Sequence, residues 1–169
     1  MSSTQDPLSR FSRLTAEWFN GTFVVPTDAQ AQAWSAIADG DNTLVVAPTG
    51  SGKTLAAFLW AIDRLAAEPR PPGTGTRVLY VSPLKALAVD VERNLRTPLT
   101  GITRIAERRG LPAPEISVGV RSGDTPPARR RELITKPPDI LITTPESLFL
   151  MLTSAARDSL ASVQTVIID

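Results

Sequence analysis

The sequence contains neither cysteine nor histidine. The first absence excludes disulfides and thiol nucleophiles, and the two together exclude a Cys/His zinc site and a histidine general base. Any chemistry must therefore use carboxylates, a metal ion and backbone dipoles. Lysine is also scarce, since only Lys53, Lys85 and Lys136 accompany the arginines.

Long apolar runs and a one-sided charge are missing as well. The best apolar stretch ends at Asp63, well short of the roughly 18 residues that a membrane span needs. Residues 1–7 lack the basic start and apolar continuation of a secretory leader, so we expect a cytoplasmic protein with no membrane partner. The formal net charge is +1, and any contact with nucleic acid must then come from local patches.

One segment carries a specific chemical signal. Residues 47–54 read Ala-Pro-Thr-Gly-Ser-Gly-Lys-Thr. The β-branched run 43–47 predicts a buried strand before the glycines, and residues 55–62 predict a helix after them. Strand, glycine turn and helix aim backbone N–H groups and a helix dipole at one anion. The segment predicts a loop that binds the phosphates of a nucleoside triphosphate; the alternative is a chance glycine turn.

Each residue type in this loop suits a particular role in binding phosphate. Gly50 and Gly52 permit turns that a Cβ would block. Lys53 would place its ammonium on the β- and γ-phosphates, and the Thr54 hydroxyl would ligate Mg²⁺. Ala47 stands where the general pattern has a glycine. The nucleotide ligands predicted in this loop are Thr49, Gly50, Ser51, Gly52, Lys53 and Thr54.

Apolar runs and helical patterns alternate along the chain, which is typical of an α/β fold with a mostly parallel sheet flanked by helices. Strands are expected at 43–47, 77–82, 116–120, 139–143 and 165–169. Helices are expected at 27–39, from 55 onward, at 83–95 and at 100–109, and two more should begin at prolines that follow the capping hydroxyls of Thr125 and Thr144. Residues 69–76 predict a surface loop.

Gln30 precedes the phosphate loop by about one helix and one strand. A glutamine amide can donate to N7 of adenine and accept from its N6 amino group, which would favour ATP over GTP. The simpler interpretation is an exposed helix residue. Phe23 could stack on the adenine ring, but we expect it to pack in the core.

Three further residues stand where predicted strands end and helices begin. An ammonium such as that of Lys85, or a hydroxyl such as that of Thr144, suits a phosphate diester at a helix N-terminus. A solvated lysine and a helix cap are the plain alternatives. Arg121 is a further candidate for such a contact. The three arginines at 129–131 predict a solvated helix face.

Together these segments resemble the superfamily 2 helicases. Residues 26–30 look like their adenine-reading Q motif, 82–87 like motif Ia and 143–147 like motif Ib. Residues 121–125 and 137–148 are similar to the large helicase-related (Lhr) group. The resemblance implies an ATP-dependent helicase with a RecA-like P-loop fold that acts on single-stranded nucleic acid, DNA in preference to RNA. It also implies an N-terminal helical extension over 1–25 and a partial ATP-binding domain over 26–169.

The final apolar run ends in Asp169. In the family it would begin the Asp-Glu-x-His box, with the aspartate holding Mg²⁺ and the next glutamate activating water. The resemblance thus implies catalytic roles for Lys53 and Asp169, with ATP and Mg²⁺ as cofactors. It places the glutamate, the motif III strand and the second RecA-like lobe beyond Asp169. We expect the 169 residues alone to hydrolyse almost nothing and, because a sheet edge is left open, to be poorly soluble or partly folded.

Two other function classes stay open at this point. A different P-loop enzyme, such as a nucleotide kinase, needs an acceptor pocket and a lid, and it has no use for Gln30, Lys85 and Thr144 in their present order. A nucleic-acid-binding module that responds to ATP without hydrolysing it is the other alternative.

Overall fold

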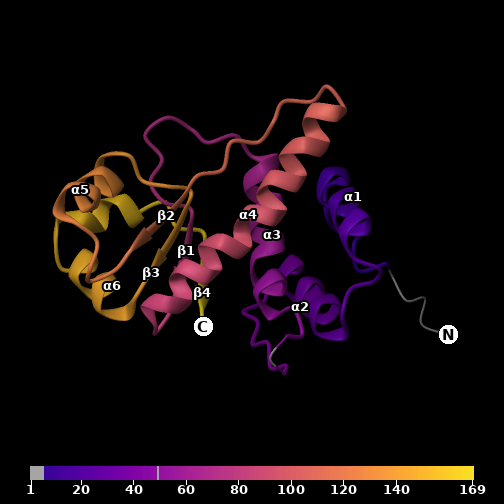
Figure 1. The fold of residues 1–169 in the computed structure, drawn as a ribbon, viewed down its shortest axis with the longest axis horizontal. Coiled ribbons are helices and arrows are strands. Elements are labelled where there is room, and N and C mark those ends of the chain that lie inside the picture. The colour runs from indigo at the N-terminus through magenta and orange to yellow at the C-terminus, as the bar shows by residue number, and fades with distance from the viewer. Residues whose placement is uncertain (1–5, 49) are drawn as a thin grey trace. The chain divides into compact units, whose positions relative to one another are not determined.

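The computed structural model describes residues 6–48 and 50–169 (Figure 1). The chain divides into two compact units, one formed by Met1–Glu68 with Pro98–Pro114, the other by Pro69–Thr97 with Glu115–Asp169. The longest helix, α4 (Lys85–Arg108), passes from the second unit to the first at Pro98.

The first unit is helical and has an aromatic core. It contains α1 (Arg13–Thr22), α2 (Asp28–Ala38), α3 (Lys53–Ala67) and the end of α4. The buried Trp34 ring meets the edges of Phe11 and Phe19, with centroids 5.0 and 5.5 Å away. Its indole N–H donates to the Ala56 carbonyl over 3.1 Å, which ties α2 to α3.

The predicted helix at 27–39 is confirmed. Thr27 and Gln30 form a reciprocal capping box at the start of α2, which satisfies two backbone donors that the first turn leaves free. Gly40 follows the helix with φ of +89°, a conformation that an L side chain disfavours.

The second unit contains a four-stranded parallel sheet of order β2-β3-β1-β4. Its strands are β1 (Val78–Val81), β2 (Val118–Arg121), β3 (Ile140–Thr143) and β4 (Thr165–Ile168). The central strands β1 and β3 are buried at every position, whereas β4 lies at an edge and alternates in exposure. Four of the five predicted strands are therefore present, and the α/β prediction is confirmed.

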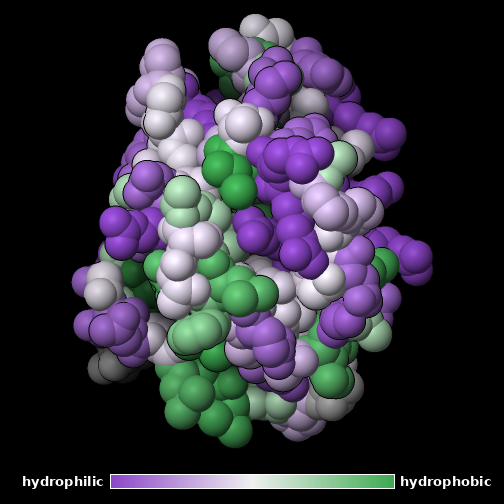
Figure 2. Space-filling view, turned by 90° about the vertical axis from the view of Figure 1, so that its left-hand side faces the viewer, coloured by the Kyte–Doolittle hydropathy of each residue, from purple (hydrophilic) through white to green (hydrophobic). Residues whose placement is uncertain are grey.

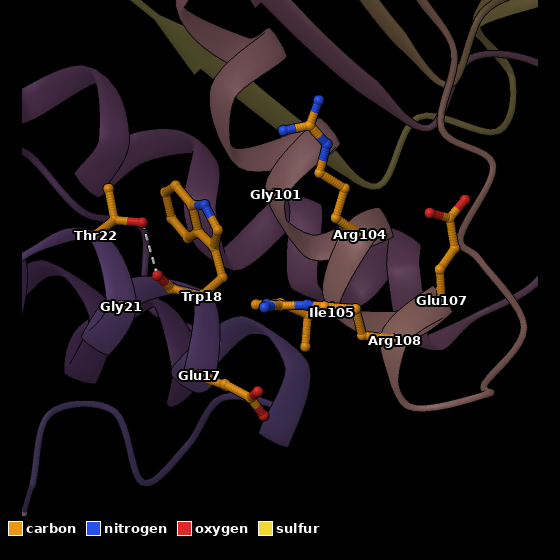
Figure 3. A pocket seen from close by; sticks show the side chains of 9 residues that line it. All are labelled: Glu17, Trp18, Gly21, Thr22, Gly101, Arg104, Ile105, Glu107 and Arg108. Atoms are coloured by element: carbon orange, nitrogen blue, oxygen red, sulfur yellow. Dashed lines mark hydrogen bonds between the residues drawn. The ribbon is translucent and has the colours of Figure 1, made fainter.

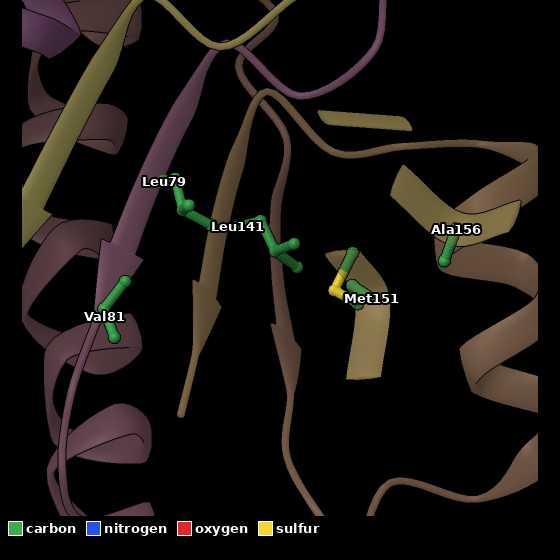
Figure 4. Close-up of a cluster of buried hydrophobic side chains, with 5 residues drawn as sticks. All are labelled: Leu79, Val81, Leu141, Met151 and Ala156. Atoms are coloured by element: carbon green, nitrogen blue, oxygen red, sulfur yellow. The ribbon is translucent and has the colours of Figure 1, made fainter. Parts of the chain in front are cut away.

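Helices cover one face of this sheet. Leu79, Val81 and Leu141 point to that face and form a buried cluster with Met151 and Ala156 (Figure 4). The last two come from α6 (Pro145–Leu152) and the 3₁₀ helix η1 (Ala155–Leu160). The remaining helix, α5 (Pro127–Thr135), packs beside β2 (Figure 1).

Asp139 joins the amino ends of three strands. Its buried carboxylate accepts hydrogen bonds from Ser117 N at 2.9 Å, Ser117 Oγ at 2.7 Å and Arg77 Nη2 at 2.8 Å. Burial by itself raises the pKa of Asp139. The Ser117 and Arg77 hydrogen bonds and the Arg70 charge together lower this pKa by more than burial raises it, so the net shift is downward. The buried Arg77 thus has a matching anion.

Residues 43–47 do not form the predicted strand. Leu44 and Val46 are 89% and 84% exposed. The four described strands pair only with one another, and β4 has one open side. A β-branched run becomes a strand only when a neighbouring strand satisfies its backbone groups, and the segment has none among the described residues.

Two expectations about helix ends are also wrong. The helices expected at 83–95 and 100–109 are one helix, α4, with Pro98 inside it, so one missing N–H did not end the helix. At α5 the N-cap is Pro126 and not Thr125. The Thr125 hydroxyl accepts from Ser122 N instead, over 2.9 Å, within the preceding turn. The cap at Thr144 and the irregular loop 69–76 are as predicted.

Some apolar side chains remain on the surface of the second unit. In α6, Phe149, Leu150 and Leu152 are each more than half exposed. Figure 2 views the side of the molecule on which α5 and α6 lie, and hydrophobic residues gather in the lower part of that face. Over the described ranges, no helix combines the length and the apolar character that crossing a membrane requires.

Candidate functional site

The phosphate loop leads directly into α3. Gly50 and Gly52 have φ of +82° and +80°. Gly52 is the N-cap of α3 and offers no side chain to the first amides of the helix. These amides and the positive end of the helix dipole suit an anion. Thr49 lies outside the described residues, while the exposed Thr54 stands in the first turn of α3.

Lys53 is folded against its own loop. Its ammonium donates to the carbonyl of Ala47 and to that of Pro48, the latter over 2.7 Å. Ser51 Oγ also donates to the Pro48 carbonyl, over 2.7 Å. The bonds that hold Lys53 are to neutral carbonyls, and an ammonium gains more from an anionic oxygen. Phosphate oxygens would therefore compete well for this group.

Gln30 connects α2 to the phosphate loop. Its side chain is 5% exposed, so the interpretation as an exposed helix residue is wrong. Oε1 accepts from Thr27 N over 3.0 Å, and Nε2 donates to the Gly52 carbonyl over 3.3 Å. Thr27 Oγ1 adds a hydrogen bond of 3.2 Å to the Ser51 carbonyl. The spacing Thr-x-x-Gln was a signal for the capping box, but no local pattern indicated the contact with Gly52.

Gly52 has a second reason to be glycine. A Cβ there would lie 2.4 Å from Gln30 Nε2, so a side chain would displace the amide. The expectation that Phe23 packs in the core is wrong, because its side chain is 40% exposed. One side of the ring still packs against Phe19 and Trp18, with centroids 4.8 and 5.9 Å away.

Asp169 directly follows β4 in the second unit. Its backbone N–H donates to the Val81 carbonyl over 3.0 Å, and its Oδ2 accepts from the Tyr80 hydroxyl over 2.8 Å. Burial, and then the hydrogen bond and charge of Asp169, raise the pKa of Tyr80. The hydroxyl therefore stays protonated as a donor. No group of three or more His, Cys, Asp and Glu side chains in the described ranges could hold a metal, and Mg²⁺ commonly takes only one or two protein carboxylates beside phosphates and water.

Lys85 and Thr144 lie after the carboxyl ends of β1 and β3. Lys85 Nζ is exposed and pairs with Asp124 Oδ2 at 2.7 Å. Thr144 is 3% exposed, and its Oγ1 accepts from Ser147 N at 3.5 Å as the cap of α6. The cap interpretation is therefore correct for Thr144, and its O–H remains a donor.

Arg121 ends β2 and is only 8% exposed. Its Nη1 has no hydrogen-bond acceptor among the described residues. Of the run 129–131, Arg129 pairs with Glu132 at 2.6 Å on the surface, as a solvated face predicts. Arg130 departs from that prediction: it is partly buried, and its Nη2 donates to the Gly123 carbonyl over 2.5 Å. Its position three residues before the buried Leu133 was the signal for an inward-facing side chain.

A hollow of about 630 Å³ lies in the first unit, between α1 and the end of α4. Trp18 and Arg108 point into it from opposite helices (Figure 3). None of the predicted site residues that the structure describes lines it. The lining residues are Glu17, Trp18, Gly21, Thr22, Gly101, Arg104, Ile105, Glu107 and Arg108.

Comparison with known proteins gives a consistent picture. The sequence model of the DEAD/DEAH box helicases matches residues 27–169. The chain is 77% identical over 164 residues to the Lhr helicase/probable uracil glycosylase of Mycolicibacterium smegmatis, covering 97% of this chain and 11% of that protein. It is 51% identical over 179 residues to the Lhr helicase/uracil glycosylase of Escherichia coli, covering all of this chain and 12% of that protein.

A solved structure is similar as well. It is the Mycobacterium smegmatis helicase Lhr bound to ssDNA and AMP-PNP, with a TM-score of 0.92 and 76% sequence identity. The match covers 97% of this chain and 21% of the other. The chain thus spans about a tenth of the length of these curated bacterial relatives and about a fifth of the solved one.

Proposed function

This chain belongs to the DEAD/DEAH box helicase family, and from that premise we propose that it is the ATP-binding front lobe of an Lhr-type, ATP-dependent helicase. Its part of the cycle would be to bind ATP with Mg²⁺ and to contact a single strand, DNA in preference to RNA. The similar helicase from Mycobacterium smegmatis was solved with ssDNA and a nucleotide analogue, which supports both ligands.

The observation that carries the proposal is the glycine turn before α3. Two glycines with positive φ expose backbone amides, and the N-cap Gly52 leaves the helix start open to a ligand. Lys53 supplies a positive charge whose present acceptors are carbonyls of the same loop. Donors, dipole and ammonium together fit a polyphosphate.

The remaining nucleotide contacts follow from the chemistry of the side chains. Lys53 would neutralise the β- and γ-phosphates, and Thr54 and Asp169 would hold Mg²⁺, which supplies charge neutralisation when bound. Gln30 would read adenine after exchanging one of its present hydrogen bonds. Because its Nε2 now bonds to Gly52 O, recognition of the base would be linked to the conformation of the phosphate loop.

The strand contacts would lie along one edge of the sheet. Arg121 is the last residue of β2, and Thr144 and Lys85 follow the carboxyl ends of β3 and β1. The three strands are neighbours in the order β2, β3, β1. Ligands of open parallel sheets bind at this edge. A guanidinium, a hydroxyl and an ammonium are suitable donors to successive phosphates. Asp124, which pairs with Lys85, would have to yield to the strand.

Efficient hydrolysis would need residues beyond Asp169. The family resemblance places a water-activating glutamate next and arginines on a second lobe, and each contributes orders of magnitude to turnover. We therefore propose that residues 1–169 alone bind nucleotide but turn it over poorly. The division into an extension over 1–25 and a partial domain over 26–169 is part of this proposal.

ATPase assays test the proposal. The chain of 169 residues and a version extended beyond Asp169 are compared with and without single-stranded DNA. Strong DNA stimulation of the extended chain supports the helicase. Stimulation by a small phosphate acceptor would favour a kinase, and ATP binding without turnover in the extended chain would favour a non-hydrolysing module.

A further inference from the structure

A second arginine, the partly buried Arg130, accompanies Arg121 near the carboxyl end of β2. Gly119 and Arg121 are two residues apart on the strand and so face the same side of the sheet. A Cβ on Gly119 would lie 2.7 Å from Leu133 Cδ2, so α5 covers that side. Arg130 precedes Leu133 by three residues and shares its side of α5. Arg121 and Arg130 therefore both lie on the side where β2 and α5 pack together.

These groups present donors that no described residue accepts. In the described part of the chain, four buried side-chain atoms have no hydrogen-bond partner, and three are here: Arg121 Nη1, Arg130 Nε and Thr143 Oγ1. Thr143 is the register partner of Arg121 on β3 and is fully buried. Buried donors without acceptors are costly and rare, and a cluster of them indicates a missing ligand.

The charge at this place is also uncompensated. No salt bridge of Arg121 or Arg130 occurs among the described residues. Burial, and after it the charge of Arg130, lowers the pKa of Arg121. An anion between the two groups would remove this repulsion.

The amino ends of the strands show that the unpaired positive charge is confined to the carboxyl ends. There the buried Arg77 donates to the buried Asp139 at 2.8 Å. The fold thus supplies a carboxylate to the buried arginine at the amino ends of the strands. At the carboxyl ends, where parallel sheets bind ligands, the buried arginine has no such partner in the described residues.

Arg130 adjoins the proposed strand contacts. Arg130 Nη2 donates to the Gly123 carbonyl, and a Cβ on Gly123 would lie 3.8 Å from Lys85 Nζ. The loop after β2 therefore lies between an ammonium and a guanidinium, with Asp124 as the acid that pairs with Lys85.

We propose that Arg121 and Arg130 together form an oxyanion site that grips one phosphodiester of the bound single strand, with the Thr143 hydroxyl as a third donor. Guanidinium groups bind phosphate in a bidentate manner that a lysine cannot reproduce. The assignment rests on the proposed function, since it names the strand as the source of the phosphate. It makes Arg130 a binding residue, in contrast to its neighbours Arg129 and Arg131.

Binding of a fluorescent oligo-dT to the 169-residue chain, measured over a series of salt concentrations, tests the assignment. Arg130→Gln should weaken binding about tenfold and reduce the magnitude of the slope of log K against log salt by about 0.7, the value of one released single-strand phosphate contact. Arg129→Gln and Arg131→Gln remove the same charge from the same helix and should leave the slope unchanged. Equal effects of all three changes would overturn the assignment.

Two further variants keep the test decisive. If the Arg130→Gln variant unfolds, as a loss of its far-UV circular dichroism would show, Arg121→Lys and Arg130→Lys are measured instead. Both variants retain the positive charge but lose the planar guanidinium. They should bind several-fold more weakly with a nearly unchanged slope, and wild-type affinity in both would overturn the site. If Lys85→Gln weakens binding whereas Arg130→Gln does not, the proposed function stands and this inference fails. If the wild-type chain binds no oligo-dT at any salt, both fail.

Inorganic phosphate separates the strand from a free anion as the occupant. At constant ionic strength, phosphate should compete with oligo-dT no better than chloride in the Arg130→Gln variant, and only modestly better in the wild type. Tight competition by phosphate in the wild type, without any slope change in Arg130→Gln, would assign the site to a free oxyanion and overturn the assignment to the strand.

Discussion

The Tyr80 hydroxyl donates a 2.8 Å hydrogen bond to Oδ2 of Asp169. Tyr80 lies on the central strand β1 and is 4% exposed, whereas Asp169 directly follows the edge strand β4. A buried tyrosine thus orients the carboxylate proposed to hold Mg²⁺. Oriented ligands bind metals more tightly than mobile ones.

Tyr80→Phe should therefore weaken the magnesium dependence of ATP binding. The ring still fills its place in β1, so we expect a loss of stability of about 1 kcal/mol. The Mg²⁺ concentration for half-maximal ATP binding should rise about tenfold, while binding in EDTA stays the same. A titration with a fluorescent ATP analogue measures both, and an unchanged magnesium requirement would show that the hydrogen bond is only structural.

Gly52→Ala should be more damaging than Gly50→Ala. Both residues have positive φ, so an alanine costs about 1–2 kcal/mol at either position. Only at position 52 would the new Cβ meet the Gln30 amide, at 2.4 Å; at position 50 the space is open. We expect ATP binding to weaken about tenfold more for Gly52→Ala, the loss of roughly one additional hydrogen bond. Equal dissociation constants for the two variants would argue against the link between Gln30 and the loop.

Gln30→Glu should reduce the preference for ATP over GTP. The carboxylate can still accept from Thr27 N, so the capping box of α2 is retained, but it cannot donate to adenine or to Gly52 O. Gln32→Glu, on an exposed position of the same helix, is the matched control for charge. Competition of ATP and GTP for the labelled nucleotide gives the ratio. If both variants keep the wild-type ratio, Gln30 does not read the base.

Asp139→Asn should destabilise the second unit most at neutral pH. The neutral amide leaves Arg77 buried without its anion, which costs about 3–5 kcal/mol. Since the folded pKa of Asp139 is lowered, its stabilisation is complete above the unfolded value of about 3.9 and is lost as pH falls below it. Urea unfolding at pH 7 and near pH 3.5 should show the gap between variant and wild type narrowing in acid. A gap that is independent of pH would contradict this account.

Much of the fold could be predicted from local patterns. The runs at 77–82 and 139–143 are apolar between their polar end residues, and they became the central strands because both of their faces are buried. The hydroxyls of Thr27 and Thr144 marked helix starts because an oxygen there satisfies a free amide.

What the sequence did not reveal depends on neighbours. The run 43–47 has the β-branched composition of a strand. A strand also needs an adjacent strand to pair with its backbone, and a local sequence pattern cannot show whether one is present. The contact of Gln30 with Gly52 and the unpaired donors of Arg121 arise from residues distant in the chain. The role of Arg130 was missed because it stands between two arginines and the whole run was interpreted as a solvated face. The helical period distinguishes it, since Arg130 lies on the same side of α5 as Leu133.

The phosphate loop is the central claim, and Lys53→Ala tests it most directly. The ammonium contacts only loop carbonyls among the described residues, so its removal should leave the far-UV circular dichroism unchanged. Equilibrium dialysis of ATP with Mg²⁺ should then show magnesium-dependent binding by the wild-type chain and a loss of at least about a hundredfold in the variant. Equal ATP affinity of the two folded proteins would contradict the phosphate-loop assignment.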